Sequence, residues 1–182
     1  TPQSFYMSCP KGAPPRWEYV AFRSREGVGW EDETEEVLVI AQVEEPVNES
    51  LVLKQTTDPD AIRKITEMRA DSPVSYARIR VFGYYDPKLN CVRMPRMAPA
   101  PGEFVYLAPD EALRKIYCYD ENEGIEVGRL LIRKLPAHFS LNGFRRHVAI
   151  LAATGAGKSY AAGLIIERLL EKGATVLVID PH

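Results

Sequence analysis

The segment 152–159, with the sequence Ala-Ala-Thr-Gly-Ala-Gly-Lys-Ser, constrains the fold of this chain more than any other segment. Residues 147–151 before it are apolar and β-prone, and residues 160–172 after it have the composition of a helix. Gly173 ends that helix, and residues 175–180 are predicted to form a second buried strand. A strand, a glycine-rich loop, a helix and a strand in this order are typical of a phosphate-binding loop in an α/β fold.

The residue types of this loop fit a polyphosphate. Small residues at 155–157 allow successive backbone N–H groups to point inward at a helix N-terminus, which makes a positive concavity for an anion. Lys158 can reach the β- and γ-phosphates as the catalytic residue, and the Ser159 hydroxyl can ligate Mg²⁺. Ala152 stands where the usual pattern has glycine, which adds one methyl and removes no phosphate-contacting group. The alternative is a glycine-rich turn that carries Lys-Ser by chance.

Composition places few other limits on function. The chain has 182 residues, room for one ordinary domain or two small ones, and its net charge of −2 gives no overall attraction to nucleic acid. A DNA contact would therefore need a local patch. Three widely spaced cysteines without a C-x-x-C pair, and no signal peptide or membrane-spanning stretch, indicate a cytoplasmic protein.

The part of the chain before the loop is predicted to be rich in short strands. Residues 1–16 are expected to be a loose arm and residues 24–34 an acidic loop, with short helices near residues 58–68 and 110–116. This pattern favours a small β-barrel or sandwich, with a domain over residues 1–135 and a second domain over residues 136–182. The predicted strands are 17–23, 36–43, 50–54, 75–84, 91–94, 104–107 and 124–132.

The predicted helix over residues 160–172 is apolar nearly all round until Glu167. Such a helix is buried between a sheet and a second element. A parallel sheet of two strands and one helix is incomplete by itself. The chain also starts at Thr1 and ends at His182 directly after a predicted strand, so we expect it to be a piece of a longer polypeptide.

Three segments resemble the HerA family, which are hexameric RecA-like DNA translocases or helicases related to FtsK. They are Leu-Asn-Gly-Phe-Arg-Arg-His-Val-Ala-Ile-Leu at 141–151, Ala-Thr-Gly-Ala-Gly-Lys-Ser at 153–159 and Val-Ile-Asp-Pro-His at 178–182. Residues 101–107 and 124–131 resemble the last segments of that family's small N-terminal barrel, which is similar to the barrel of ATP synthase subunits. The resemblance implies an N-terminal β-barrel followed by the start of a RecA-like α/β P-loop ATPase domain.

The resemblance also implies an activity. Members couple hydrolysis of ATP, with Mg²⁺, to movement along double-stranded DNA, and act with the NurA nuclease in processing DNA ends. The Walker B acids, the arginine finger and the DNA-contacting loops would lie beyond His182, so this chain alone is not expected to hydrolyse ATP efficiently. The residues that carry over as nucleotide-binding are Ala152, Ala153, Thr154, Gly155, Ala156, Gly157, Lys158 and Ser159.

Other candidate residues have two interpretations each. Asp180 lies where the family has a strand-end acid near the metal, and it is equally an ordinary acid that ends a strand before a turn. His147 and His182 could face nucleotide or DNA, although a structural role is commoner for a lone histidine. The pair Arg145 and Arg146 could contact DNA or a neighbouring subunit, although a solvated pair is the commoner outcome. A mixed solvated surface is likewise favoured over a basic barrel face formed by Arg78, Arg80, Arg93 and Arg96.

Two hypotheses from different classes follow. In the first, the full polypeptide is a motor, a DNA-stimulated ATPase that forms a homo-oligomeric ring, expected to be a hexamer, on duplex DNA. In the second, the barrel is an oligomerisation and nuclease-docking module without catalysis of its own. A rotary subunit of the ATP synthase type is more remote, because the loop and the Asp-Pro-His ending fit the translocases better.

Overall fold

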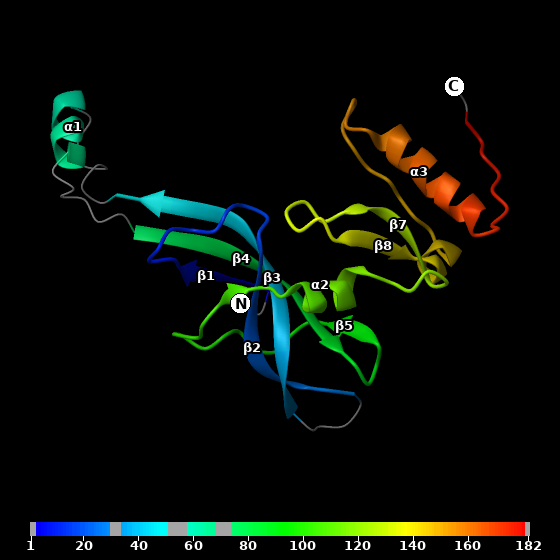
Figure 1. The fold of residues 1–182 in the computed structure, drawn as a ribbon, viewed down its shortest axis with the longest axis horizontal. Helices are drawn as coiled ribbons and strands as arrows, with labels where there is room; N and C mark the ends of the chain where they lie inside the picture. The colour runs from blue at the N-terminus through cyan, green and yellow to red at the C-terminus, as the bar shows by residue number, and fades with distance from the viewer. Residues whose placement is uncertain (1–2, 30–33, 51–57, 68–73, 181–182) are drawn as a thin grey trace. The chain divides into compact units, whose positions relative to one another are not determined.

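The computed structural model describes residues 3–29, 34–50, 58–67 and 74–180 of the chain (Figure 1). The chain divides into two compact units, Thr1–Ala112 and Leu113–His182. The first unit contains a six-stranded sheet and the second a two-stranded sheet. The domain boundary near residue 135, which the sequence suggests, stays a prediction.

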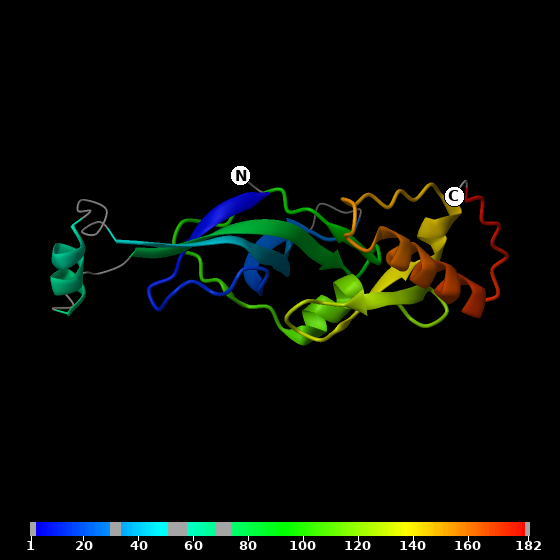
Figure 2. The same ribbon diagram turned by 90° about the horizontal axis from the view of Figure 1, so that it is seen from above.

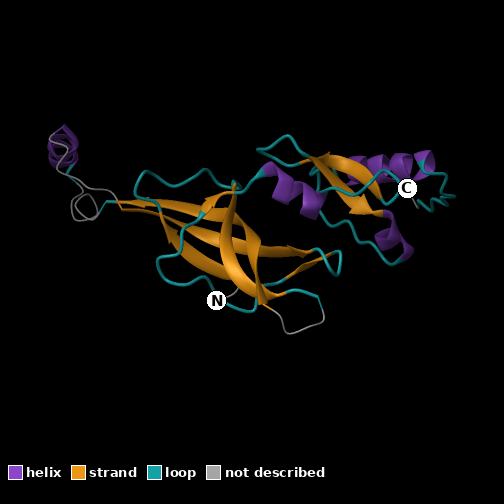
Figure 3. Ribbon diagram, turned by 60° about the horizontal axis from the view of Figure 1, so that its bottom comes forward, coloured by secondary structure: helices purple, strands orange, loops and turns teal. Residues whose placement is uncertain are grey.

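The sheet of the first unit is antiparallel throughout, and its spatial order is β1-β4-β3-β2-β6, with β5 paired to β4. Its two long strands lie side by side, from Val39 opposite Tyr84 to Glu49 opposite Val74 (Figure 3). The strands are β1 (Ser4–Ser8), β2 (Tyr19–Gly27), β3 (Thr34–Glu49), β4 (Val74–Asp86), β5 (Cys91–Arg93) and β6 (Tyr106–Leu107).

The sheet curls so that β1 approaches β2. These strands are separated in the sheet by β4 and β3, which in a flat sheet would place them about 14 Å apart. The rings of Phe5 on β1 and Phe22 on β2 nevertheless meet edge to face, with their centroids 5.3 Å apart. The core inside this curl consists of Cys9, Val20, Phe22, Val39, Ala41, Val43, Ala77, Ile79, Val81 and Tyr84.

Strand β1 corrects the expectation that residues 1–16 form a loose arm. Ser4–Ser8 pairs with β4 residue by residue, from Ser4 opposite Arg80 to Ser8 opposite Tyr76. Phe5 and Met7 alternate toward the core and pack against it, which supplies the burial that holds this strand in place. The proline and glycine content that suggested a loop lies after the strand, at residues 10–15.

Several other predicted elements differ in length or are confirmed. The loop predicted at 24–34 is shorter, because β2 continues to Gly27, where it pairs with Thr34. The strand predicted at 104–107 is reduced to Tyr106–Leu107, and the one at 50–54 falls almost wholly on residues 51–57, outside the described residues. The helices are confirmed as α1 (Pro59–Glu67) and α2 (Asp110–Tyr117), and the β4–β5 hairpin is confirmed as well.

The second unit contains a hairpin in the region where the sequence predicts one strand followed by the domain boundary. Strand β7 (Gly124–Arg129) is shorter than the predicted 124–132, and an unpredicted strand, β8 (Pro136–Ser140), begins directly after the predicted boundary. Lys134 has φ of 54° in the turn, and the Leu130 N–H donates to the Leu135 carbonyl at 2.8 Å. Pro136 is tolerated because it is the first residue of its strand.

Helical elements complete the second unit. A 3₁₀ helix, η2 (Leu141–Arg145), follows β8, and α3 (Lys158–Glu171) follows the glycine-rich loop. Helix α3 packs against β7 (Figure 2). This contact covers one side of the helix and leaves the rest of it accessible, so the helix is half-buried rather than enclosed.

A buried carboxylate joins two hairpin ends of the first unit. The Asp86 carboxylate, with none of its surface exposed, accepts hydrogen bonds from the N–H groups of Gly29, Lys88 and Leu89 and from Arg93. Arg93 also donates to the carbonyl of Gly27. Burial by itself raises the pKa of Asp86, yet these four donors outweigh it and hold the pKa below its ordinary value.

The Phe5–Phe22 contact predicts that β1 contributes to stability. We expect Phe5→Ala to lower the free energy of unfolding by about 2 kcal/mol, because it removes a half-buried ring and its edge-to-face partner contact. Tyr6→Ala on the same strand is the control and should cost less than about 1 kcal/mol, because Tyr6 is 69% exposed. Urea denaturation measures both, and equal losses would contradict the role given to Phe5.

The low pKa of Asp86 predicts a pH dependence of stability. The ionised carboxylate stabilises the fold fully above the ordinary aspartate pKa of about 3.9, and this contribution is lost as the pH falls through the lower folded-state value. The melting temperature of the wild type should therefore fall more between about pH 5 and about pH 2 than that of Asp86→Asn. Asp60→Asn, which changes an exposed carboxylate, should retain the wild-type slope.

Candidate nucleotide-binding site

The backbone of the loop before α3 has the geometry of an anion nest. Gly155 has φ of 80° and Gly157 has φ of 85°, with Ala156 between them outside the positive-φ region. The Ala156 N–H donates to the Ala153 carbonyl at 3.1 Å, which closes a turn at the base of the loop. Alternation of left-handed and other residues turns successive N–H groups toward one side, which is how such loops bind phosphate.

The helix start adds to this concavity. Gly157 is the N-cap of α3 and has no side chain to cap the first turn, and the first helical bond runs from the Ala161 N–H to the Gly157 carbonyl at 2.9 Å. The first N–H groups of a helix have no partner within the helix, and the helix dipole places positive charge there. An anionic ligand is the natural acceptor for these groups.

The loop side chains are accessible to a ligand. All residues from 151 to 160 are exposed, including Lys158 and Ser159, the first two residues of α3. The structure therefore brings together the predicted nucleotide-binding residues 152–159 on one loop and helix start. A charged lysine and a hydroxyl beside backbone donors can bind a polyphosphate and its magnesium ion.

The two strands expected on either side of this loop do not form. Residues 147–153 and 174–180 carry no strand, and no ladder joins them in the part of the chain that the structure describes. Leu151 is 90% exposed and Ile179 is 86% exposed, so these apolar segments are not buried. A strand needs a neighbour for its backbone hydrogen bonds. The strands described in this unit are β7 and β8, which pair with each other and not with these segments.

The structure says less about the functional roles of the remaining candidate residues. Asp180 lies exposed on the extended segment after α3, and its metal role stays a prediction. Arg145, Arg146 and His147 are all exposed around the end of η2, and His182 lies outside the described residues. No group of three or more His, Cys, Asp or Glu side chains that could hold a metal ion lies among the described residues.

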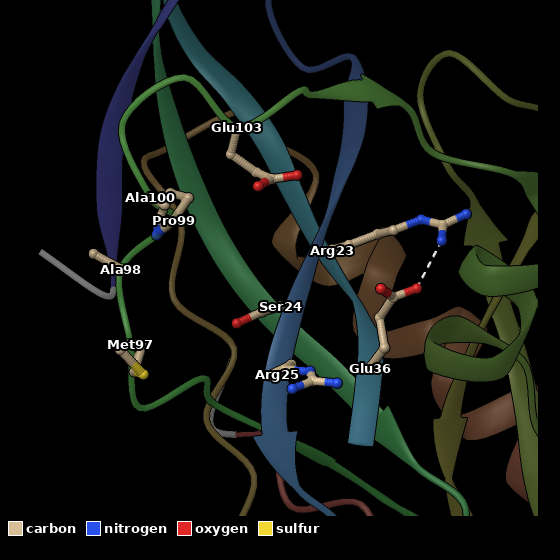
Figure 4. A pocket seen from close by; sticks show the side chains of 9 residues that line it. All are labelled: Arg23, Ser24, Arg25, Glu36, Met97, Ala98, Pro99, Ala100 and Glu103. Carbon is tan, nitrogen blue, oxygen red and sulfur yellow. Dashed lines mark hydrogen bonds and ion pairs between the residues drawn. The ribbon is translucent and has the colours of Figure 1, made fainter. Parts of the chain in front are cut away.

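The first unit contains a charged cavity that the sequence did not indicate. It has a volume of about 350 Å³ and lies between β2 and the connector over residues 97–103 (Figure 4). Arg23 points toward Glu36 and pairs with it at 2.6 Å, and Glu103 approaches from the connector. The charged side chains that line the cavity are two arginines, Arg23 and Arg25, and two glutamates, Glu36 and Glu103, so its formal charge is balanced.

The structure also tests the basic face considered for the first unit. Arg93 does not belong to one, because it pairs with buried Asp86 at 3.0 Å. Arg78 pairs with Glu44 at 3.5 Å. These contacts confirm the prediction of a mixed surface for Arg78 and Arg93. Their partners lie 34 and 7 positions away in the sequence, so composition alone does not identify the pairs.

The region that contains the glycine-rich loop is similar to known proteins. A family model described as the central domain of helicase HerA matches residues 125–182. The DNA double-strand break repair helicase HerA of Pyrococcus furiosus is 48% identical over 127 residues, which is 66% of this chain and 22% of the relative. The enzyme of the same name from Saccharolobus solfataricus is 34% identical over 125 residues, which is 69% of this chain and 24% of the relative.

The chain belongs to the HerA family. A probable helicase of Methanocaldococcus jannaschii is also similar, at 32% identity over 154 residues, which is 79% of this chain and 28% of the relative. The chain thus spans about a quarter of the length of these curated relatives. The whole glycine-rich loop falls inside the region matched to the HerA central domain. No helix within the described residues is long and apolar enough to cross a membrane.

The glycine geometry predicts opposite effects of the same substitution at two sites. A Cβ at Gly157 or at Gly163 would meet no heavy atom within 4 Å, so neither site is limited by space. Gly157→Ala should destabilise the start of α3 by about 1 kcal/mol, because residue 157 has a φ of 85°. Gly163→Ala should stabilise α3 by about 1 kcal/mol, because glycine in a helix interior is less favourable than alanine. Amide hydrogen exchange of α3 measures both, and a shared sign would contradict this loop conformation.

Proposed function

We propose that this chain supplies the nucleotide-binding loop of an ATP-driven DNA helicase or translocase that acts in DNA double-strand break repair. The observation that carries the proposal is the uncapped N-terminus of α3 behind two positive-φ glycines, within the part that matches the HerA central domain. The names of the relatives, DNA double-strand break repair helicases, support the DNA substrate.

The residues present fit ATP and Mg²⁺. ATP supplies a phosphoanhydride bond whose cleavage passes through a transition state with charge spread over the γ-phosphoryl oxygens. Backbone N–H groups of residues 155–159 bind and orient the phosphates, and Lys158 neutralises their charge. The Ser159 hydroxyl would be the magnesium ligand, and Asp180 is our candidate for a second contact on the metal side.

We also propose the wider assembly that the family resemblance implies. The close contact of Phe5 with Phe22 across the sheet supports a barrel-like first unit, and the exposed apolar segments at 147–151 and 175–180 support burial in a RecA-like parallel sheet with further strands. A homo-oligomeric, hexameric ring and a NurA-type nuclease partner complete this proposal. In the alternative, the first unit is a docking module, for which its independent core is the supporting observation.

The motor proposal predicts a DNA-stimulated ATPase that depends on Lys158. In the complete polypeptide that carries this sequence, duplex DNA should raise the rate of ATP hydrolysis. Lys158→Ala should lower that rate by about 100-fold or more, since it removes a charge aimed at the phosphates. Lys115→Ala on α2, an exposed lysine outside the loop, should leave the rate within about twofold as a control.

The outcomes separate the two functions. A rate that duplex DNA does not change argues against translocation, and the docking module then becomes the better account. A rate that Lys158→Ala does not change removes the loop from the catalytic site altogether.

A further inference from the structure

Helix α3 carries an exposed aromatic side chain at its start. Tyr160, the third residue of the helix, is 80% exposed. At helical spacing it lies on the same face as Gly163, Glu167 and Glu171, all of which are exposed. The opposite, half-buried face is formed by Ala161, Ala162, Leu164, Ile165, Ile166, Arg168 and Leu169.

The position of Tyr160 is not explained by packing within the second unit. Helix α3 packs against β7, and its half-buried residues form a stripe that does not include Tyr160. The face that carries Tyr160 bears two carboxylates, Glu167 and Glu171, two and three turns further along, with the exposed Leu170 beside them. An aromatic ring in such a place is available for a planar ligand.

The direction of the side chain favours the loop. Cα–Cβ bonds in an α-helix tilt toward its N-terminus, so a residue in the first turn projects over the segment that precedes the helix. For Tyr160 that segment is the nest formed by Gly155 and Gly157. Gly163, one turn further along, has no side chain and no heavy atom within 4 Å of an added Cβ, which leaves open space beside the ring.

We propose that Tyr160 stacks on the base of the nucleotide whose phosphates occupy this loop. The inference rests on the proposed function, because it needs a nucleotide in the nest. It adds a specificity element to that site: the loop binds the triphosphate, and Tyr160 distinguishes a nucleotide from a bare polyphosphate. Stacking of a base on an aromatic side chain is tolerant of base identity, so the contact favours nucleoside triphosphates as a class.

Calorimetric titration of the complete polypeptide with ATP and with inorganic tripolyphosphate tests this assignment. Tyr160→Ala should weaken ATP binding by about 10-fold or more and leave tripolyphosphate binding within about twofold, because only ATP has a base. Tyr160→Phe keeps the ring and should bind both ligands like the wild type. Glu167→Gln, a change on the same helix face, is the matched control and should leave both affinities unchanged.

Each outcome decides the matter. If Tyr160→Ala weakens both ligands equally, the residue acts through the loop conformation and the stacking assignment is wrong. If it weakens neither, or if Tyr160→Phe behaves like Tyr160→Ala, the assignment is also wrong. Lys158→Ala should weaken the binding of both ligands, because both have phosphates. If Lys158→Ala weakens binding and Tyr160→Ala has no effect, the proposed nucleotide site stands and only the stacking assignment is wrong. A wild type that binds neither ligand overturns both proposals.

Discussion

Every strand of this chain depends on a neighbour that accepts and donates its backbone hydrogen bonds. In the first unit the requirement is met, since β3 is paired on one side by β2 and on the other by β4 along most of its length. In the second unit β7 and β8 satisfy each other. The β-prone segments on either side of the loop have no such neighbour in the described chain, so they form no ladder and most of their side chains are exposed.

The glycine-rich loop at residues 152–159 does not share this dependence. Its shape comes from two glycine φ angles, one turn bond and the first turn of α3, all within ten residues of sequence. The geometry that binds an anion is therefore present even though the flanking strands are not. This separation explains how the loop keeps its local geometry in a unit whose described residues form a sheet of a single hairpin.

The first unit shows the opposite behaviour, because its distinctive contacts are distant in sequence. Asp86 binds the N–H of Gly29, and Tyr84 donates to the carbonyl of Gly27, each across 57 positions. The buried carboxylate of Glu26 accepts the N–H of Arg96 across 70 positions. These hydrogen bonds fasten the end of β2 to the β4–β5 hairpin and to the connector, and they leave the two buried acids satisfied.

The sequence by itself determined the features that depend on near neighbours. The glycine-rich loop with Lys158 and Ser159, helix α3, the Asp58–Pro59 start of α1 and the β4–β5 hairpin could all be predicted, because residue types within one or two turns decide them. Membership of the HerA family followed from the same local motifs. Only the tertiary structure decided that Ser4–Ser8 is a strand, that Arg93 is paired with Asp86, that residues 136–140 form a hairpin with β7, and that residues 147–153 form no strand. The physical reason is that a strand and a buried ion pair are stable only with a partner, and the partner's position in space is not encoded in the residues beside it.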